Sequence, residues 1–252
     1  MPLPVTRSGN PSLNERVFAS QPRPAYGAER MTLQGSINKA FLLLVVLLAG
    51  AFWPWSQYLT NGDLSVVSTS LMVGAFGGLI VGMIISFKAT LAPYLSVPYA
   101  ALEGLAIGGI SAVLERRYPG IAIQAVGLTF AVLAVMLVAY KLGIIRATER
   151  FRAIVIGATG AIALVYLVSV VLGLFHVSVP LLNSSSPLGI IVSLVIVGVA
   201  ALNLILDFDF IESGASQGAP RYMEWYAAFG LLVTMVWLYM EILRLLSKTR
   251  RD

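Results

Sequence analysis

The sequence has no cysteine and a single histidine, His176. The lack of cysteine excludes disulfides, thiolate metal sites and a cysteine nucleophile, and one histidine cannot form a multi-histidine metal cluster. A glycine-rich phosphate loop, the His-Glu motif of metalloproteases and a serine–histidine pair supported by an acid are also missing from the sequence. We therefore expect that the protein is not an enzyme and has no cofactor.

Charged residues are scarce. They make up 12% of the 252 residues, whereas 58% are hydrophobic and the mean hydropathy is +0.86. A soluble domain carries about 25% charged residues, so this composition indicates a polytopic membrane protein embedded in the lipid bilayer. The net charge of +5 lies mostly at the termini and in one loop, which indicates membrane topology and contact with anionic lipid, not binding to nucleic acid.

Seven apolar segments, each close to the ~20 residues needed to cross a bilayer, predict an all-α protein with seven transmembrane helices. Short breaks with turn residues separate the segments. We expect helices at about 37–58, 64–87, 92–114, 121–140, 151–175, 188–206 and 225–246. In the second segment, small residues four apart, such as Gly74 and Gly78, are best explained by close helix packing.

The predicted transmembrane domain covers residues 37–247. Before it, residues 1–36 are rich in proline and arginine and predict a mostly disordered cytoplasmic arm that ends in an amphipathic stretch, and residues 248–252 form a basic tail. With the N-terminus inside, eleven of the 17 lysines and arginines face the cytoplasm and six face the other side. This excess favours a cytoplasmic N-terminus in the cell's inner membrane. The basic tail would then end outside, unless the last segment re-enters instead of crossing.

Three acids follow the uncharged stretch 187–206: Asp207, Asp209 and Glu212. Asn203 and Asp207 are four residues apart and share a helix face, whereas Asp209 points away. Because a carboxylate at a helix C-terminus meets the negative pole of the helix dipole, another interaction should hold it. Asn203 and Asp207 are therefore candidates for an inward polar stripe, with Asp209 and Glu212 as a solvated rim. The alternative is an ordinary helix terminus at the membrane edge.

Glu103 lies about halfway between Lys88 and Glu115, which places its carboxyl near the middle of the bilayer. An ionised acid there costs about 3 kcal/mol, so the side chain should face the bundle or water. Ser96 and Ser111 fall on the same helix face and extend a weak polar stripe. Two interpretations stay equally open: a neutral acid that fastens helices, and a role in the passage of protons or cations.

Other polar residues have simpler explanations. Glu224 begins the last segment, where negative charge suits the helix dipole, and we expect it to be solvated. Thr234 is most simply a residue that bonds back to its own helix. Glu241 and Arg244, three apart, predict a local ion pair. His176 is expected at the membrane interface.

The seven spans, Glu103-Gly104 in the third, and Asp207 followed by Phe-Asp-Phe-Ile after the sixth resemble the Bax inhibitor (transmembrane Bax inhibitor motif) family. The stretches Met31–Lys39 and Trp225-Tyr-Ala-Ala-Phe-Gly further resemble its bacterial branch. The resemblance implies a fold in which the last helix is surrounded by the other six.

The resemblance also implies a proton-sensitive calcium leak, governed by two aspartates and by a basic residue after the second helix. Asp207 matches the first aspartate and Lys88 the basic residue, but Thr234 stands where the second aspartate is expected. Threonine cannot titrate, so Glu224 or Glu103 would have to replace it in a pair that shares a proton.

From these observations we expect a slow flux of cations, namely calcium, across the membrane. Protonation of Asp207 and Glu103 would modulate this flux. Asp207 and Asn203 would form the cytoplasmic mouth, where Lys88 competes with the cation, and Glu103 and Thr234 would line the middle. Calcium prefers six to eight oxygen ligands, so Asp207 would bind it only weakly and in passing.

Two alternatives belong to other classes of protein. An interaction protein that regulates a membrane protease or a stress response would use the N-terminal arm and the lipid-facing surface. A proton-coupled transporter ranks last because the sequence has no convincing internal repeat.

Overall fold

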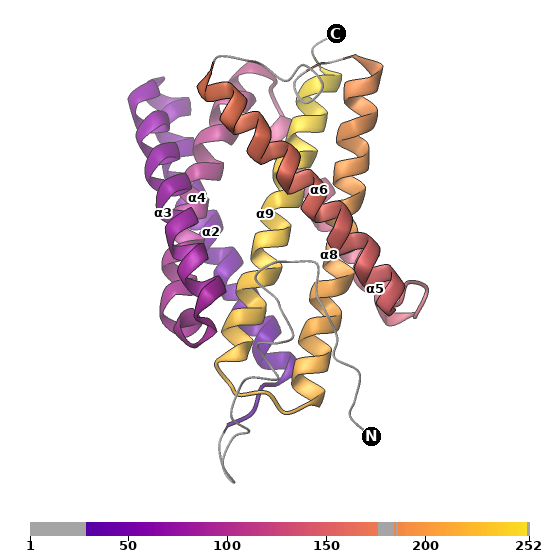
Figure 1. The fold of residues 1–252 in the computed structure, drawn as a ribbon. Coiled ribbons are helices and arrows are strands. Elements are labelled where there is room, and N and C mark those ends of the chain that lie inside the picture. Colours follow the sequence, from indigo (N-terminus) through magenta and orange to yellow (C-terminus); the bar gives the residue numbers. More distant parts are fainter. Residues whose placement is uncertain (1–28, 176–183, 185, 251–252) are drawn as a thin grey trace.

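The computed structural model describes residues 29–175, 184 and 186–250. In this part of the chain, seven α-helices are long and apolar enough to cross a membrane, which confirms the predicted all-α fold (Figure 1). The helices are α2 (Leu33–Asn61), α3 (Leu64–Phe87), α4 (Ala92–Arg117), α5 (Ile121–Lys141), α6 (Glu149–Leu174), α8 (Pro187–Ser216) and α9 (Met223–Thr249), with a short 3-10 turn, η1 (Ala89–Leu91), before α4. The predicted position of His176 lies outside the described residues.

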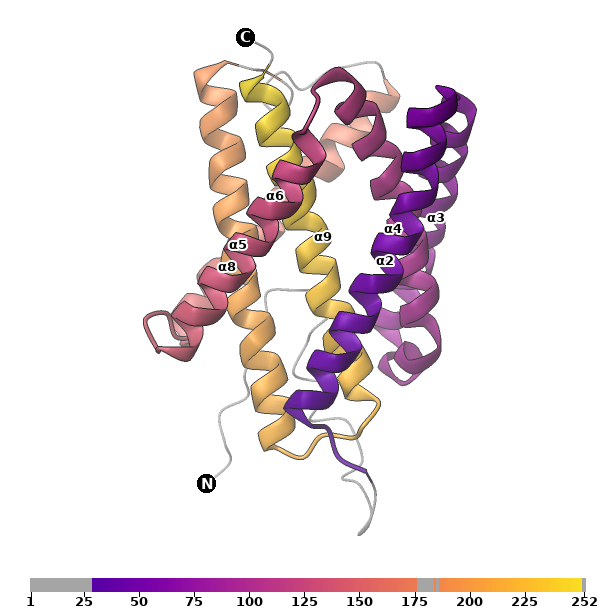
Figure 2. The same ribbon diagram turned by 180° about the vertical axis from the view of Figure 1, so that it is seen from behind.

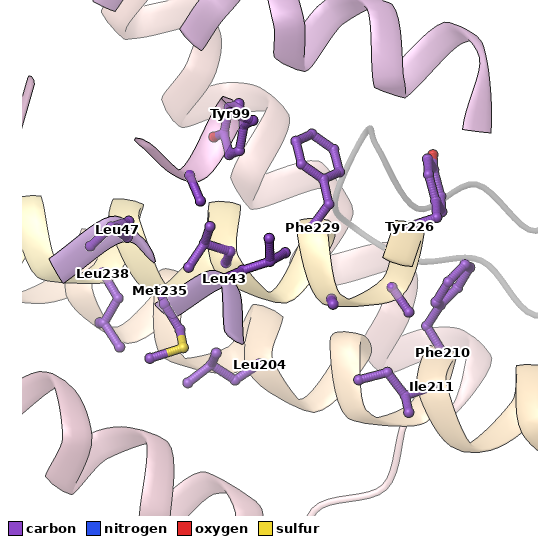
Figure 3. Close-up of a cluster of buried hydrophobic side chains, with 14 of the residues drawn as sticks. Leu43, Leu47, Tyr99, Leu204, Phe210, Ile211, Tyr226, Phe229, Met235 and Leu238 are labelled. Atoms are coloured by element: carbon purple, nitrogen blue, oxygen red, sulfur yellow. The ribbon is translucent and has the colours of Figure 1, made fainter. Parts of the chain in front are cut away.

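The last helix, α9, is the centre of the bundle (Figures 1 and 2). It packs against α2, α4, α5 and α8, whereas α3 packs on α4 and α2, and α6 packs on α8. Large side chains along α9 are fully enclosed, among them Tyr226, Phe229 and Leu238, and they meet side chains of α2, α4 and α8 (Figure 3). The helix is continuous from Met223 to Thr249, so a re-entrant last segment is wrong.

Glycines allow the backbone of α4 to contact the backbones of its neighbouring helices. A Cβ on Gly104 would lie 2.3 Å from the carbonyl oxygen of Leu47 in α2, and one on Gly108 would lie 2.1 Å from that of Ala51. On the other side, a Cβ on Gly74 of α3 would lie 2.5 Å from the carbonyl oxygen of Leu102. Small residues therefore let α2, α3 and α4 pack as one tight group, as the spacing in the second span predicts.

The first helix begins before the predicted span. Thr32 is its N-cap, and the Thr32 hydroxyl accepts a hydrogen bond of 2.9 Å from the backbone N–H of Gly35. Just before it, residues 29–31 pair with the loop between α8 and α9: Met31 N–H donates to the Ala219 carbonyl at 2.7 Å. The last part of the predicted arm is thus tied to the start of α9.

Candidate functional site

Asp207 lies inside α8 and not at its end. The helix continues to Ser216, because Phe208, Phe210 and Ile211 are buried in the hydrophobic core. The Asp207 side chain is 0% exposed. The interpretation of Asp207 as an ordinary helix terminus at the membrane edge is therefore wrong, and its carboxyl is enclosed by protein.

Asn203, one turn before Asp207, is also buried. Its Nδ2 donates to Thr159 Oγ1 on α6 at 2.8 Å and to the carbonyl oxygen of Val199 at 2.9 Å. Its Oδ1 accepts no hydrogen bond from the described residues. Asn203 therefore has an unpaired oxygen one turn from the buried acid. Leaving a buried acceptor unpaired lowers the stability of the fold by about 1–3 kcal/mol.

Asp209 and Glu212 extend from α8 toward α6 and α5. Arg152 Nη2 lies 2.5 Å from Asp209 Oδ2, and the side chains of Arg152 and Asp209 are 4% and 22% exposed. Arg152 Nη1 also lies 3.3 Å from Glu149. Glu212 is exposed and accepts a hydrogen bond of 2.5 Å from the Tyr140 hydroxyl. The predicted solvated rim is wrong for Asp209, because a buried guanidinium holds it.

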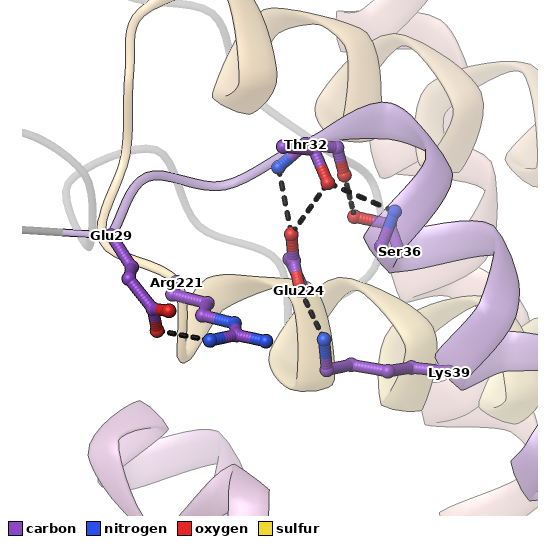
Figure 4. Close-up of polar contacts among 7 residues, drawn as sticks. Glu29, Thr32, Ser36, Lys39, Arg221 and Glu224 are labelled. Carbon is purple, nitrogen blue, oxygen red and sulfur yellow. Dashed lines mark hydrogen bonds and ion pairs between the residues drawn. The ribbon is translucent and has the colours of Figure 1, made fainter.

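Glu224 fastens the start of α9 to the start of α2 (Figure 4). Its Oε1 accepts hydrogen bonds of 2.8 Å from both the backbone N–H and the hydroxyl of Thr32, and its Oε2 pairs with Lys39. The side chain is buried, so the expectation of a solvated acid is wrong. Next to it, an exposed pair joins Glu29 and Arg221, and this hydrogen bond raises the pKa of Arg221 above its usual value. With both oxygens of Glu224 occupied, this acid is a poor substitute for a second carboxyl beside Asp207.

Glu103 and Asp207 lie on different sides of the central helix. The Glu103 carboxyl packs against α3, where a Cβ on Gly78 would lie 2.9 Å from Oε1. α4, which carries Glu103, and α8, which carries Asp207, flank α9 (Figures 1 and 2). This arrangement contradicts the expectation that Asp207 forms the mouth and Glu103 the middle of one path.

Lys88 ends α3 with an exposed side chain and makes no ion pair with the described residues. The predicted engagement of Asp207 by Lys88 is thus not found in the structure. Thr234 is buried and its hydroxyl donates to the Gly230 carbonyl at 3.4 Å, which confirms the expected bond to its own helix.

Thr234 nevertheless lies in the same part of the α8–α9 interface as Asp207. These antiparallel helices are in register at two points: the ring centroids of Phe210 and Tyr226 are 6.3 Å apart, and Lys248 Nζ lies 2.7 Å from Ser193 Oγ. Asp207 lies between these points on α8, and Thr234 lies between them on α9. Thr234 is therefore the α9 residue to substitute when testing Asp207.

A family model described as Bax inhibitor 1 like matches residues 10–251, nearly the whole chain. The chain belongs to this family. Comparison with curated proteins and with solved structures finds no match. The last helix of this Bax inhibitor 1 like protein is central, as the resemblance implies, but α2, α4, α5 and α8 pack closely on it, whereas α3 and α6 pack mainly on those helices.

At the other end of α9, this Bax inhibitor 1 like protein has a second buried acid. Glu241 is 1% exposed, and its Oε1 accepts a hydrogen bond of 2.6 Å from the Tyr166 hydroxyl of α6. Arg244 lies 3.5 Å from the same oxygen, which confirms the predicted ion pair, and it also donates to Tyr166 at 2.6 Å. This cluster attaches α6 to the centre of the bundle.

Sequence reasoning missed Arg152, Tyr140 and Tyr166, the partners of the acids. Arg152 is one of the eleven lysines and arginines expected on the cytoplasmic side, and its side chain is buried at the first turn of α6. One signal was available: Arg152 falls on the first turns of an apolar helix, where a charged side chain must point at a partner. Which acid it meets depends on the packing of α6 on α8 and cannot be read from spacing.

Proposed function

We propose that this Bax inhibitor 1 like protein mediates a slow, pH-modulated leak of cations, calcium foremost, across its membrane, along the side of the bundle formed by α6, α8 and α9. The observation that carries the proposal is the complete burial of Asp207 within a long apolar helix. Placing an ionised acid inside a membrane costs about 3 kcal/mol, and such residues mark the paths of ions and protons. Asn203 adds a free amide oxygen one turn away.

The enclosure of Asp207 accounts for the slow rate. A cation reaches the carboxyl only when a neighbouring helix shifts, so flux follows the small population of an open state. Among the described residues no cluster of three or more histidines or acids could hold a metal ion. Asp207, Asn203 and backbone oxygens give calcium fewer ligands than it prefers, which suits transient binding during passage.

The Arg152–Asp209 ion pair makes the cation flux depend on pH. It closes α6 onto α8 two residues from Asp207, and Arg152, not Lys88, is the basic residue beside the candidate path. Protonation of Asp209 removes its charge and with it the attraction to the guanidinium. Acid therefore loosens α6 from α8, while protonation of Asp207 weakens its pull on a cation.

The test is calcium uptake into proteoliposomes that contain the wild type or single variants. Asp207→Asn should lower the flux to that of empty liposomes, because the amide keeps the shape and loses the charge. Asp63→Asn is the matched control: Asp63 is an exposed N-cap of α3, and asparagine caps a helix equally well. Glu103→Gln should also keep the wild-type flux, since Glu103 faces α3. Equal uptake by the wild type and Asp207→Asn would overturn the proposal.

If the protein carries no ion flux, the alternative function is that of an interaction protein that regulates a membrane protease or a stress response. That role would rest on residues 1–28, which lie outside the described residues. Deleting them separates the two functions, because the leak path proposed here uses only α6, α8 and α9.

A further inference from the structure

An apolar groove of about 440 Å³ lies between α2 and α5, with α4 and α9 as its floor. It opens to the outside of the bundle, because Phe52 and Ile123 on its walls are 63% and 71% exposed. This volume falls in the range of small-molecule sites. The groove is not lined by Asp207, Asn203 or Asp209, so it is separate from the proposed leak path.

The groove has the length of one membrane leaflet. On α2 it runs from Leu44 to Trp55, roughly 17 Å along a helix that rises about 1.5 Å per residue, which is about half of a hydrocarbon core. It ends near Ala122, where α5 begins, on the side of the membrane opposite the start of α2. An occupant would thus extend from the middle of the bilayer to one interface.

The hydroxyl groups in the groove already have partners. The hydroxyls of Ser111 and Tyr239 are 2.7 Å apart, and Ser111 Oγ also donates to the Ile107 carbonyl at 2.6 Å. Thr129 Oγ1 donates to the Ala125 carbonyl at 2.7 Å. Because these hydroxyls are satisfied within the protein, the groove suits a hydrocarbon chain better than a polar substrate.

Two guanidinium groups flank the interfacial end of the groove. Arg116 lies over the ring of Tyr58, one turn beyond Trp55, at 5.4 Å from its centroid. Arg250 donates to Gln124 Oε1 at 2.7 Å and to the carbonyl oxygens of Pro119 at 2.9 Å and Tyr118 at 3.4 Å, next to the start of α5. Neither arginine has an acid partner in the described part of the chain, and guanidinium groups bind phosphate well.

We infer that the groove binds one acyl chain of an anionic glycerophospholipid, with the lipid phosphate between Arg116 and Arg250. Bilayer lipid is as apolar as the groove, so burial alone cannot select an occupant. Selection comes from the fit of one chain in the groove and from the positive charge at its end.

The test uses the full chain in phosphatidylcholine vesicles that contain phosphatidylglycerol with a photoreactive diazirine near the end of one acyl chain. Met235 and Tyr239 on the groove floor are each 8% exposed, so they are labelled only by a chain that has entered. We expect saturable labelling of α9, competed by unlabelled phosphatidylglycerol and not by added phosphatidylcholine. Labelling confined to exposed surfaces such as α6, or equal competition by both lipids, would overturn the inference.

Two kinds of variant sharpen the test. Val126→Trp places an indole inside the groove and should lower labelling of α9 at least about ten-fold. Leu128→Trp is its control on the same helix, exposed to lipid outside the groove. Arg116→Gln should lower the preference for phosphatidylglycerol about five-fold, whereas Lys141→Gln at the other end of α5 should not. A photo-crosslinked dimer that Val126→Trp abolishes would instead identify a second copy of the chain as the occupant and overturn the inference.

Discussion

Arg152 of α6 and Asp209 of α8 form a buried ion pair, with 2.5 Å between Nη2 and Oδ2, two residues from the enclosed Asp207. Apart from Arg152, Val155 is the buried residue of α6 among those described, and hydrogen bonds between Thr159 and Asn203 and between Tyr166 and Glu241 also hold the helix. The ion pair is the contact of α6 that lies nearest in sequence to Asp207, so we expect it to affect how firmly α6 covers this acid.

Replacing Arg152 should open the leak. With Arg152→Gln, the calcium flux into proteoliposomes should rise about ten-fold, because a loss of about 1.4 kcal/mol from the closed state raises the open population by that factor. The exposed neighbour Arg150 provides the control variant Arg150→Gln, which should behave as the wild type. A folded Arg152→Gln protein with unchanged flux would show that the pair is no gate.

A carboxyl at position 234 should confer strong pH dependence. Thr234→Asp places a second acid in the part of the interface that holds Asp207, and two such groups share a proton at low pH. As the pH rises, the pair gains charge and attracts cations, so flux should increase with pH more steeply than in the wild type. Thr234→Asn has nearly the same shape and does not titrate. Identical pH profiles for the two variants would mean that position 234 does not face Asp207.

The two ion pairs at the start of α9 should differ in their effect on stability. Glu224→Gln breaks a buried pair with Lys39 and should lower the free energy of unfolding by about 3 kcal/mol. Glu29→Gln breaks the adjacent pair between Glu29 and Arg221. Both side chains are more than half exposed, so solvent screens the pair and its loss should cost much less than the loss of the buried pair. Unfolding in detergent micelles, followed by circular dichroism, measures both. Equal losses would contradict the role of Glu224 in joining α2 to α9.

A methyl group on Gly104 should disrupt the bundle. Gly104→Ala would set its Cβ against the backbone of α2, which cannot move aside as a flexible side chain can. We expect loss of folded protein in detergent, seen as aggregation in size-exclusion chromatography. Gly127→Ala has no atom within 4 Å of the new Cβ and should be neutral or stabilising by about 1 kcal/mol. A monodisperse Gly104→Ala protein would show that α2 and α4 can separate.

The sequence predicts the helices well because their hydrophobic length is a local property. Seven spans, the packing role of the glycines and the Glu241–Arg244 pair all follow from spacing within one segment. The end of α8 does not: Asp207 and Asp209 suggest that the helix leaves the membrane, and only its packing against α9 shows why it continues.

The spacing of residues in the sequence does not predict which partners the charged side chains contact. Glu224 has the signature of a solvated first-turn acid, and its burial depends on the distant segment around Thr32. Likewise, Glu103 and Asp207 look alike as membrane acids, yet the bundle places them on opposite sides of α9. Assigning such residues to one path requires the rotation of each helix, which a weakly amphipathic apolar sequence does not encode.

The backbone contact at Gly104 and Gly108 has a mechanical consequence. Helices that touch through main-chain atoms cannot slide past each other by changing side-chain rotamers, so α2, α3 and α4 must travel as a rigid block. α6 has no such clamp, since Gly157 and Gly160 on it meet no other atom within 4 Å of a built Cβ. We therefore expect α2, α3 and α4 to stay together during any conformational change, and the helices around Asp207 to account for most of the movement.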